Sequence, residues 1–124
     1  MEAACCLSSY LKNNDDDTFH TLIEMGDLAV ECVGERFSAK TDEHEYLRLL
    51  DILQEVRTPA ARGLLRTQLM QPFSRRWVMA MDAFTYSLAP EVAELDRLRS
   101  ELTENDPETR SKAEVIDRIL RDLA

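Results

Sequence analysis

The chain is poor in residues that interrupt helices and in residues that bind metals. Its 124 residues include only three glycines, four prolines, three cysteines and two histidines. Few helix breakers, together with many Leu, Ala, Glu and Arg residues, favour helix over strand. No apolar run approaches the roughly 18 residues that mark a membrane-spanning helix, so none is expected. The composition, 44% hydrophobic and 31% charged, is that of a globular protein.

The cysteines do not form a recognisable framework. Cys5, Cys6 and Cys32 are odd in number and two of them are adjacent, which disfavours a set of structural disulfides. They also lack the CxxC spacing of zinc and redox sites. The first residues carry no basic segment of the kind that begins a signal peptide. We therefore expect a cytoplasmic protein with reduced thiols.

Motifs for catalysis are missing as well. The sequence has no glycine-rich phosphate loop, no GxSxG or HExxH motif and no EF-hand loop. His20 and His44 have carboxylates at helical spacing, which is a ligand set that metals accept. Both histidines are expected in the first turn of a helix, however, where acidic caps are ordinary. We predict no catalytic residue, no cofactor and no metal ligand.

Carboxylates spaced three residues apart provide the main enzymatic alternative. Some helical hydrolases hold magnesium with such pairs, so a magnesium-dependent helical hydrolase is the alternative to a binding protein. Most of these pairs lie on the polar faces of amphipathic helices, where the spacing arises by chance in an acidic chain. The hydrolase hypothesis requires the pairs to converge in one cleft. They are Glu24 with Asp27, Glu91 with Glu94, Glu101 with Glu104, and Glu114 with Asp117.

Apolar residues recur at helical spacing along most of the chain. One helix is expected from residues 19 to 37, after an N-cap at Asp16, Asp17 or Thr18. Gly26 lies on its apolar stripe, where a glycine would let a neighbouring helix approach closely. The next helix is expected to be capped by Thr41. Further starts are indicated by Thr58-Pro59, Ser74, Pro90 and Pro107, and Pro72 should end the helix that precedes it.

These signals predict a single all-α domain over residues 1–124, a compact bundle of five to seven helices. The helices over residues 42–56 and 75–88 should be central, and the Trp77, Met79, Met81, Phe84 and Tyr86 cluster should lie in the core. The last two helices have narrow apolar stripes and many charges. We expect them either to fold back as a helical hairpin or to reach toward a partner, with residues 105–124 as a candidate protruding helix.

Charge is distributed unevenly along the chain. The net charge is −9, and residues 1–62 carry 13 acidic and six basic residues. This acidity opposes binding to nucleic acid and to anionic membranes. Between Val56 and Met81 there is no Asp or Glu, although there are five arginines. These arginines are our candidate partner-binding residues: Arg57, Arg62, Arg66, Arg75 and Arg76.

Two hypotheses account for this arginine stretch. In the first, the arginines form a basic patch that binds an acidic partner, a phosphate or a nucleic acid. In the second, they pair with the acids of the helices over residues 19–37 and 42–56, within the fold or across a dimer. Exposed ion pairs of that kind are common and contribute little to stability.

We expect a non-enzymatic cytoplasmic protein that binds another protein. Regulators, secretion chaperones, immunity proteins and phage inhibitors share this size and acidity. The excess of Arg over Lys, 12 against three, is typical of a GC-rich bacterium or its phage. The acidic first half would suit competition for a basic surface. The alternatives are the magnesium-dependent hydrolase and a nucleic-acid-binding regulator that uses the Arg57–Arg76 stretch; homodimerisation is left open.

Overall fold

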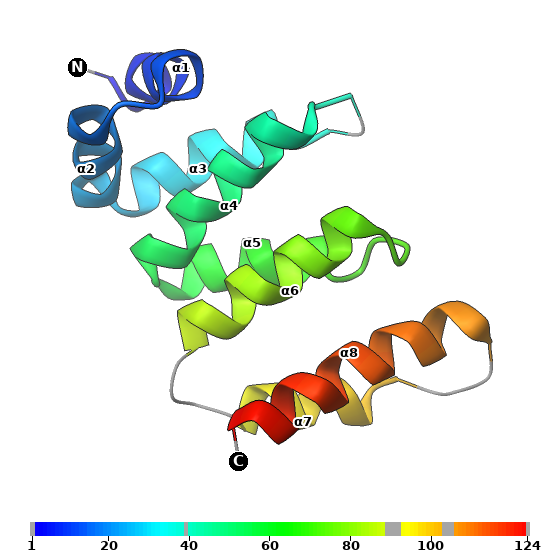
Figure 1. Ribbon diagram of the computed structural model, residues 1–124. Coiled ribbons are helices and arrows are strands. Elements are labelled where there is room, and N and C mark those ends of the chain that lie inside the picture. The colour runs from blue at the N-terminus through cyan, green and yellow to red at the C-terminus, as the bar shows by residue number, and fades with distance from the viewer. Residues whose placement is uncertain (1, 39, 89–92, 103–105, 124) are drawn as a thin grey trace.

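The computed structural model describes residues 2–38, 40–88, 93–102 and 106–123, and Figure 1 shows helices joined by short connections. None of these residues is in a strand. The helices are α1 (Ala3–Asn13), α2 (Asp16–Met25), α3 (Asp27–Arg36), α4 (Glu43–Val56), α5 (Pro59–Gln68), α6 (Arg75–Leu88), α7 (Ala93–Ser100) and α8 (Pro107–Leu123). The prediction of an all-α fold is confirmed, but the predicted count of five to seven is wrong, because the described residues form eight helices.

The helices follow one another in space in the order of the chain. Extensive packing joins helices that are one or two apart in sequence, such as α1 with α3, α2 with α4, α3 with α5 and α4 with α6. Figure 1 accordingly shows α1 and α2 at one end and α7 with α8 at the other. This is the packing of stacked helical hairpins, in which each hairpin mainly contacts its neighbours.

The extra helix comes from a break at Gly26. The predicted helix over residues 19–37 is divided into α2 and α3, and Gly26 between them has φ +58° and ψ −124°. Residues with a Cβ atom rarely adopt this backbone conformation, whereas glycine does so without steric cost. The predicted role of Gly26 was wrong, since no heavy atom lies within 4 Å of a Cβ placed there. Gly26 turns the chain and does not bring two helices together.

Helices α4 and α6 are central, as predicted, and pack more extensively against each other than any other pair. Both contribute large side chains to the core, which also includes Leu95 of α7 and Ile116 of α8. The buried residues of α4 are Tyr46, Leu49, Leu50, Ile52 and Leu53, and those of α6 include Trp77, Ala80, Met81, Ala83 and Phe84. Tyr86 was wrongly predicted to be in the core, because it is half exposed.

Several helix starts have polar side-chain caps. Thr58 accepts a hydrogen bond from Ala61 N at 3.2 Å, and Ser74 accepts one from Trp77 N at 3.3 Å, as the sequence predicted. Two caps lie one residue from a predicted position, since Asp15 caps α2 and Asp42 caps α4. The Thr41 hydroxyl is buried instead and donates to Arg36 O at 2.9 Å. Pro90 lies outside the described residues.

The last two helices pack against each other as a hairpin. Ala113 and Ile116 of α8 are buried, and Arg99 of α7 pairs with Asp117 of α8 at 2.8 Å. Helix α8 also contacts the connection between α5 and α6. There Lys112 Nζ donates to Gln71 O at 2.7 Å, and the backbone N–H of Phe73 donates to Glu108 at 2.7 Å.

Candidate partner-binding surface

The five candidate arginines fall into two groups. Arg57 and Arg66 contact Tyr86 and Phe84 in the last turns of α6. Arg75 and Arg76 lie in its first turn. At 1.5 Å per residue, the eight residues from Arg76 to Phe84 separate the two groups by about 12 Å. Arg57 and Arg66 are therefore nearer the C-terminal end of α6, whereas Arg75 and Arg76 are at its N-terminal end.

The first group is occupied by contacts within the chain. The guanidinium of Arg57 stacks 4.9 Å from the centroid of Tyr86. Arg62 donates to Arg57 O at 3.1 Å, and its buried Nε has no hydrogen-bond partner among the described residues. Arg66 forms an ion pair with Glu94 and lies over the ring of Phe84. These arginines hold the connection after α4 and the start of α7 against α6.

The second group, like the first, contains one ion-paired arginine among the described residues. Arg75 pairs with Glu43 at 3.1 Å, but 82% of its side chain is exposed, so this pair is weak. Arg76 makes no ion pair among the described residues. Its guanidinium donates to the backbone oxygens of Ser38 and Thr41 and lies 5.0 Å from the centroid of Tyr46. Arg76 is thus held in place without a carboxylate to neutralise it.

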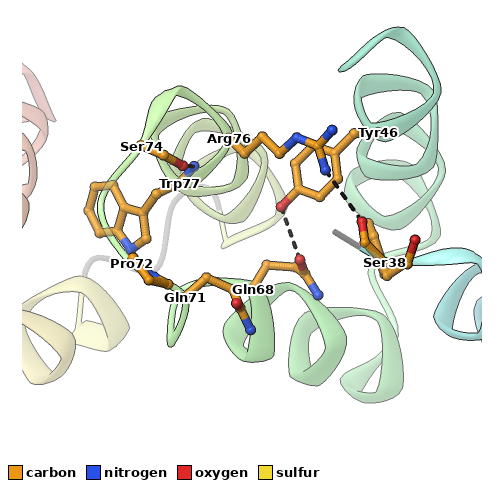
Figure 2. A pocket seen from close by; sticks show the side chains of 9 residues that line it. Ser38, Tyr46, Gln68, Gln71, Pro72, Ser74, Arg76 and Trp77 are labelled. Atoms are coloured by element: carbon orange, nitrogen blue, oxygen red, sulfur yellow. Dashed lines mark hydrogen bonds between the residues drawn. The ribbon is translucent and has the colours of Figure 1, made fainter. Parts of the chain in front are cut away.

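Arg76 lines a cavity of about 510 Å³ between α4, α5 and α6 (Figure 2). This is within the range of about 300–1,000 Å³ that is usual for ligand sites. The walls combine aromatic rings, side-chain amides and hydroxyls, and Arg76 is their one charged group. The lining residues are Phe37, Ser38, Tyr46, Gln68, Gln71, Pro72, Ser74, Arg76 and Trp77.

Two hydrogen bonds hold the aromatic side chains of Tyr46 and Trp77, which line this cavity. The Tyr46 hydroxyl donates to Gln68 Oε1 at 3.0 Å, and the Trp77 indole donates to the backbone oxygen of Leu69 at 3.0 Å. Burial raises the pKa of Tyr46, and the nearby charge of Arg76 opposes that shift. The Gln68 side chain accepts from Tyr46 through Oε1, so its amide N–H groups remain available to a ligand. The cavity therefore offers hydrogen-bond donors beside apolar walls.

The connection between α5 and α6, which supplies Gln71 and Pro72 to the cavity, also carries exposed apolar side chains. Met70 is 77% exposed and Phe73 is 37% exposed, and the Phe73 ring packs against Trp77 with centroids 5.5 Å apart. We call residues 69–76 the α5–α6 corner. Two large exposed apolar side chains on one short connection are more informative than single exposed residues scattered over a surface.

The candidate metal and hydrolase residues do not converge among the residues that the structure describes, where no group of three or more His, Cys, Asp or Glu side chains is arranged to hold a metal ion. Glu94 pairs with Arg66 and Arg97, and Asp117 pairs with Arg99. Asp27 accepts a hydrogen bond from Thr58. Glu91 and Glu104 lie outside the described residues, and His20 and His44 are both exposed.

Sequence analysis missed most of the cavity. Its residues come from three separate segments, and no local spacing indicates that Tyr46, Gln68 and Trp77 meet. The one usable signal was the acid-free stretch that contains Arg75 and Arg76. The aromatic partners of the arginines were also missed, because each ring lies at least eight residues away in sequence from its arginine.

Within the described part of the chain, no helix has the length and apolar content needed to cross a membrane. No protein-family model matches the sequence, and comparisons with curated proteins and with solved structures find no match. The functional argument therefore depends on the chemistry of the surface itself.

Proposed function

We propose that this chain is a non-enzymatic protein that binds another protein through the α5–α6 corner. The observation that carries the proposal is the combination of exposed Met70 and Phe73 with an un-neutralised Arg76 in the adjoining cavity. Interfaces are enriched in aromatic residues, Met and Arg at their centres, and anchoring side chains of a partner fill pockets of this kind.

The partner that fits this surface presents an apolar side chain together with a carboxylate. The apolar part would cover Met70 and Phe73, and the carboxylate would face Arg75 and Arg76. Charge complementarity supports this choice, because the corner is locally basic in a chain with a net charge of −9. A regulator, chaperone, immunity protein or inhibitor is compatible with such a surface, and the source organism is proposed to be a bacterium or its phage.

A matched pair of variants tests the surface. Met70→Glu places a negative charge on the corner, whereas Leu28→Glu places it at Leu28 of α3, which is 66% exposed. Thr58 at the start of α5 bonds to Asp27, so Leu28 lies near the N-terminal end of α5 and Met70 follows its C-terminal end. The two variants therefore introduce the same negative charge near opposite ends of α5.

The measurement is affinity capture from a lysate of the native host, followed by titration of the captured protein with each purified variant. We expect the wild type and Leu28→Glu to bind alike, and Met70→Glu to bind about tenfold more weakly, since central interface residues cost about 1 kcal/mol or more when replaced. Equal binding by Met70→Glu, or loss of binding by Leu28→Glu alone, would contradict the proposal. Capture of a second copy of this chain would make the surface a dimer interface instead.

A further inference from the structure

We infer that the cavity beside the α5–α6 corner binds a carboxylate carried on an apolar peptide segment of the partner, with Arg76 as its anchor. This inference deepens the proposed function and rests on it, because it names the chemistry that the corner recognises. It concerns Arg76, Gln68 and Gln71 at the cavity wall, whereas the proposed function concerns the exposed rim.

The positive charge of Arg76 favours a negatively charged ligand in the cavity. Arg76 is the one charged residue among those that line the cavity, and it makes no ion pair among the described residues. A guanidinium has five N–H donors, and two backbone carbonyls accept from Arg76 here, so donors remain for a ligand. Both carbonyls and the Tyr46 ring hold the guanidinium in place, so little conformational entropy is lost when it binds an anion.

The uncharged residues around Arg76 favour a ligand with one negative charge over a polyanion. Gln68, Gln71 and Ser74 supply uncharged hydrogen-bond donors. Arg76 is the one cation among the described residues that line the cavity, and Lys112 lies 5.6 Å from the centroid of Trp77. A phosphate dianion would bring more negative charge than one guanidinium balances. The net charge of the whole chain, −9, disfavours polyanions further. A carboxylate matches the single guanidinium in both charge and geometry.

The surroundings select a peptide segment over a free small acid. The apolar surface extends beyond the cavity, because the ring of Trp77, which lines it, packs against the ring of Phe73. Met70 adds a further exposed apolar side chain on the same connection. A small carboxylic acid would leave this rim uncovered, whereas an Asp or Glu residue with apolar neighbours would cover it. Figure 2 shows the cavity residues arranged around one space, with Arg76 and Gln68 on opposite sides of it.

The test uses two blocked tripeptides, acetyl-Leu-Glu-Leu-amide and acetyl-Leu-Gln-Leu-amide, which differ by one charge. Trp77 is the single tryptophan of the chain, so its indole N–H gives one NMR resonance at the cavity wall. Each peptide is titrated to about 10 mM, a range that covers the weak affinity of so small a ligand. We expect the Glu peptide to shift this resonance and to bind about fivefold more tightly than the Gln peptide.

Gln71 is replaced in place of Arg76, because a change at Arg76 would also remove its contacts within the fold. Gln71 is exposed, and its contact with Lys112 uses the backbone oxygen, so the side chain can be changed without loss of packing. Gln71→Glu should weaken binding of the Glu peptide about threefold and Gln71→Lys should strengthen it about threefold. Arg118→Gln and Asp122→Asn make the same changes in net charge at exposed positions of α8, and should leave the affinity unchanged.

Three outcomes would overturn the inference. They are equal affinity for the Glu and Gln peptides, no shift of the Trp77 resonance over the whole titration, and binding of free 4-methylpentanoate as tight as that of the Glu peptide. If one of these occurs while partner capture still depends on Met70, the carboxylate inference fails and the proposed function stands. If capture is also independent of Met70, both fail.

Discussion

At the scale of single residues, Thr58 stabilises the start of α5 in two ways. Its hydroxyl caps the helix by accepting from Ala61 N, and it also bonds to Asp27 at the start of α3. We predict that Thr58→Ala lowers the free energy of unfolding by about 1 kcal/mol, the usual cost of a lost N-cap. Urea denaturation measures the difference.

Thr67→Ala is the matched control for this prediction. The Thr67 hydroxyl is exposed and donates to Gly63 O within the same helix, so its loss should change stability by less than about 0.5 kcal/mol. If the two variants are destabilised equally, the capping role of Thr58 is wrong.

Asp51 of α4 gives a prediction about pH. Burial raises the pKa of its carboxyl group, and the charge of Glu55 one turn away raises it further. When the pKa of an acid is higher in the folded state, the folded state binds the proton more tightly. The ionised carboxylate then lowers stability above that pKa, and the cost disappears as pH falls through it.

We therefore expect Asp51→Asn to be more stable than the wild type at pH 7, with an advantage that shrinks as the pH is lowered. Chemical denaturation at a series of pH values measures this advantage. Asp122→Asn removes the same charge from an exposed site of α8 and corrects for general charge repulsion. An advantage of Asp51→Asn that grows toward acid pH would refute the account.

The candidate site could be predicted from the sequence only in part. The acid-free stretch drew attention to Arg75 and Arg76, because a run without acids stands out in an acidic chain. The role of Arg76 depends on Tyr46 and on the Ser38 carbonyl, which are 30 and 38 residues away. Contacts at that separation follow from how α4 and α6 pack, and no local pattern encodes them.

At the scale of helices, the two glycines of the α2–α3 region should respond oppositely to the same substitution. Gly26→Ala forces a side chain into a conformation with φ +58°, which should cost about 1–3 kcal/mol. Gly34 lies inside α3, and a Cβ there would meet Leu64 at an ordinary 3.5 Å. Gly34→Ala should therefore stabilise the protein by about 0.5–1 kcal/mol through helix propensity.

Thermal and urea unfolding of both glycine variants measure this contrast. A stable Gly26→Ala protein would mean that α2 and α3 form one continuous helix, as the periodicity alone suggested. A destabilised Gly34→Ala protein would mean that Leu64 lacks the room to accommodate a methyl group.

Helix boundaries were predictable where a cap or a proline marks them. Thr58-Pro59 and Pro107 begin α5 and α8, and α5 ends before Pro72, because proline restricts the backbone on both of its sides. The break at Gly26 was missed since apolar residues keep their helical spacing through it. Glycine within a periodic segment is compatible with both a continuous helix and a turn, and only tertiary packing decides between them.

At the scale of the whole molecule, the candidate arginines divide between the C-terminal and the N-terminal end of α6. Arg57 and Arg66 contact rings of α6, and Arg66 is paired with Glu94, so these charges stabilise the fold. At the α5–α6 corner, Arg75 is largely exposed and Arg76 makes no ion pair among the described residues, so both are proposed to meet a partner. A short basic surface on a chain of net charge −9 suits a discrete acidic segment better than a long polyanion.

This distribution predicts no stable binding to nucleic acid. A fluorescein-labelled duplex in about 50 mM salt should show no change in anisotropy with added protein, because too few phosphates could be neutralised. Steeply salt-dependent binding that is lost in the Arg62, Arg66, Arg75 and Arg76 quadruple glutamine variant would contradict this prediction and restore the regulator hypothesis.

The central claim, that the α5–α6 corner is the surface that meets a partner protein, is tested most directly by site-specific photocrosslinking in the native host. A benzophenone amino acid replaces Met70 in one variant and Leu28 in another, since both positions are exposed and lie near opposite ends of α5. We predict one discrete crosslinked protein from position 70, none from position 28, and a weaker product when Gln71→Glu is added. Crosslinking from position 28 alone, or a product from position 70 that Gln71→Glu leaves unchanged, would contradict the account.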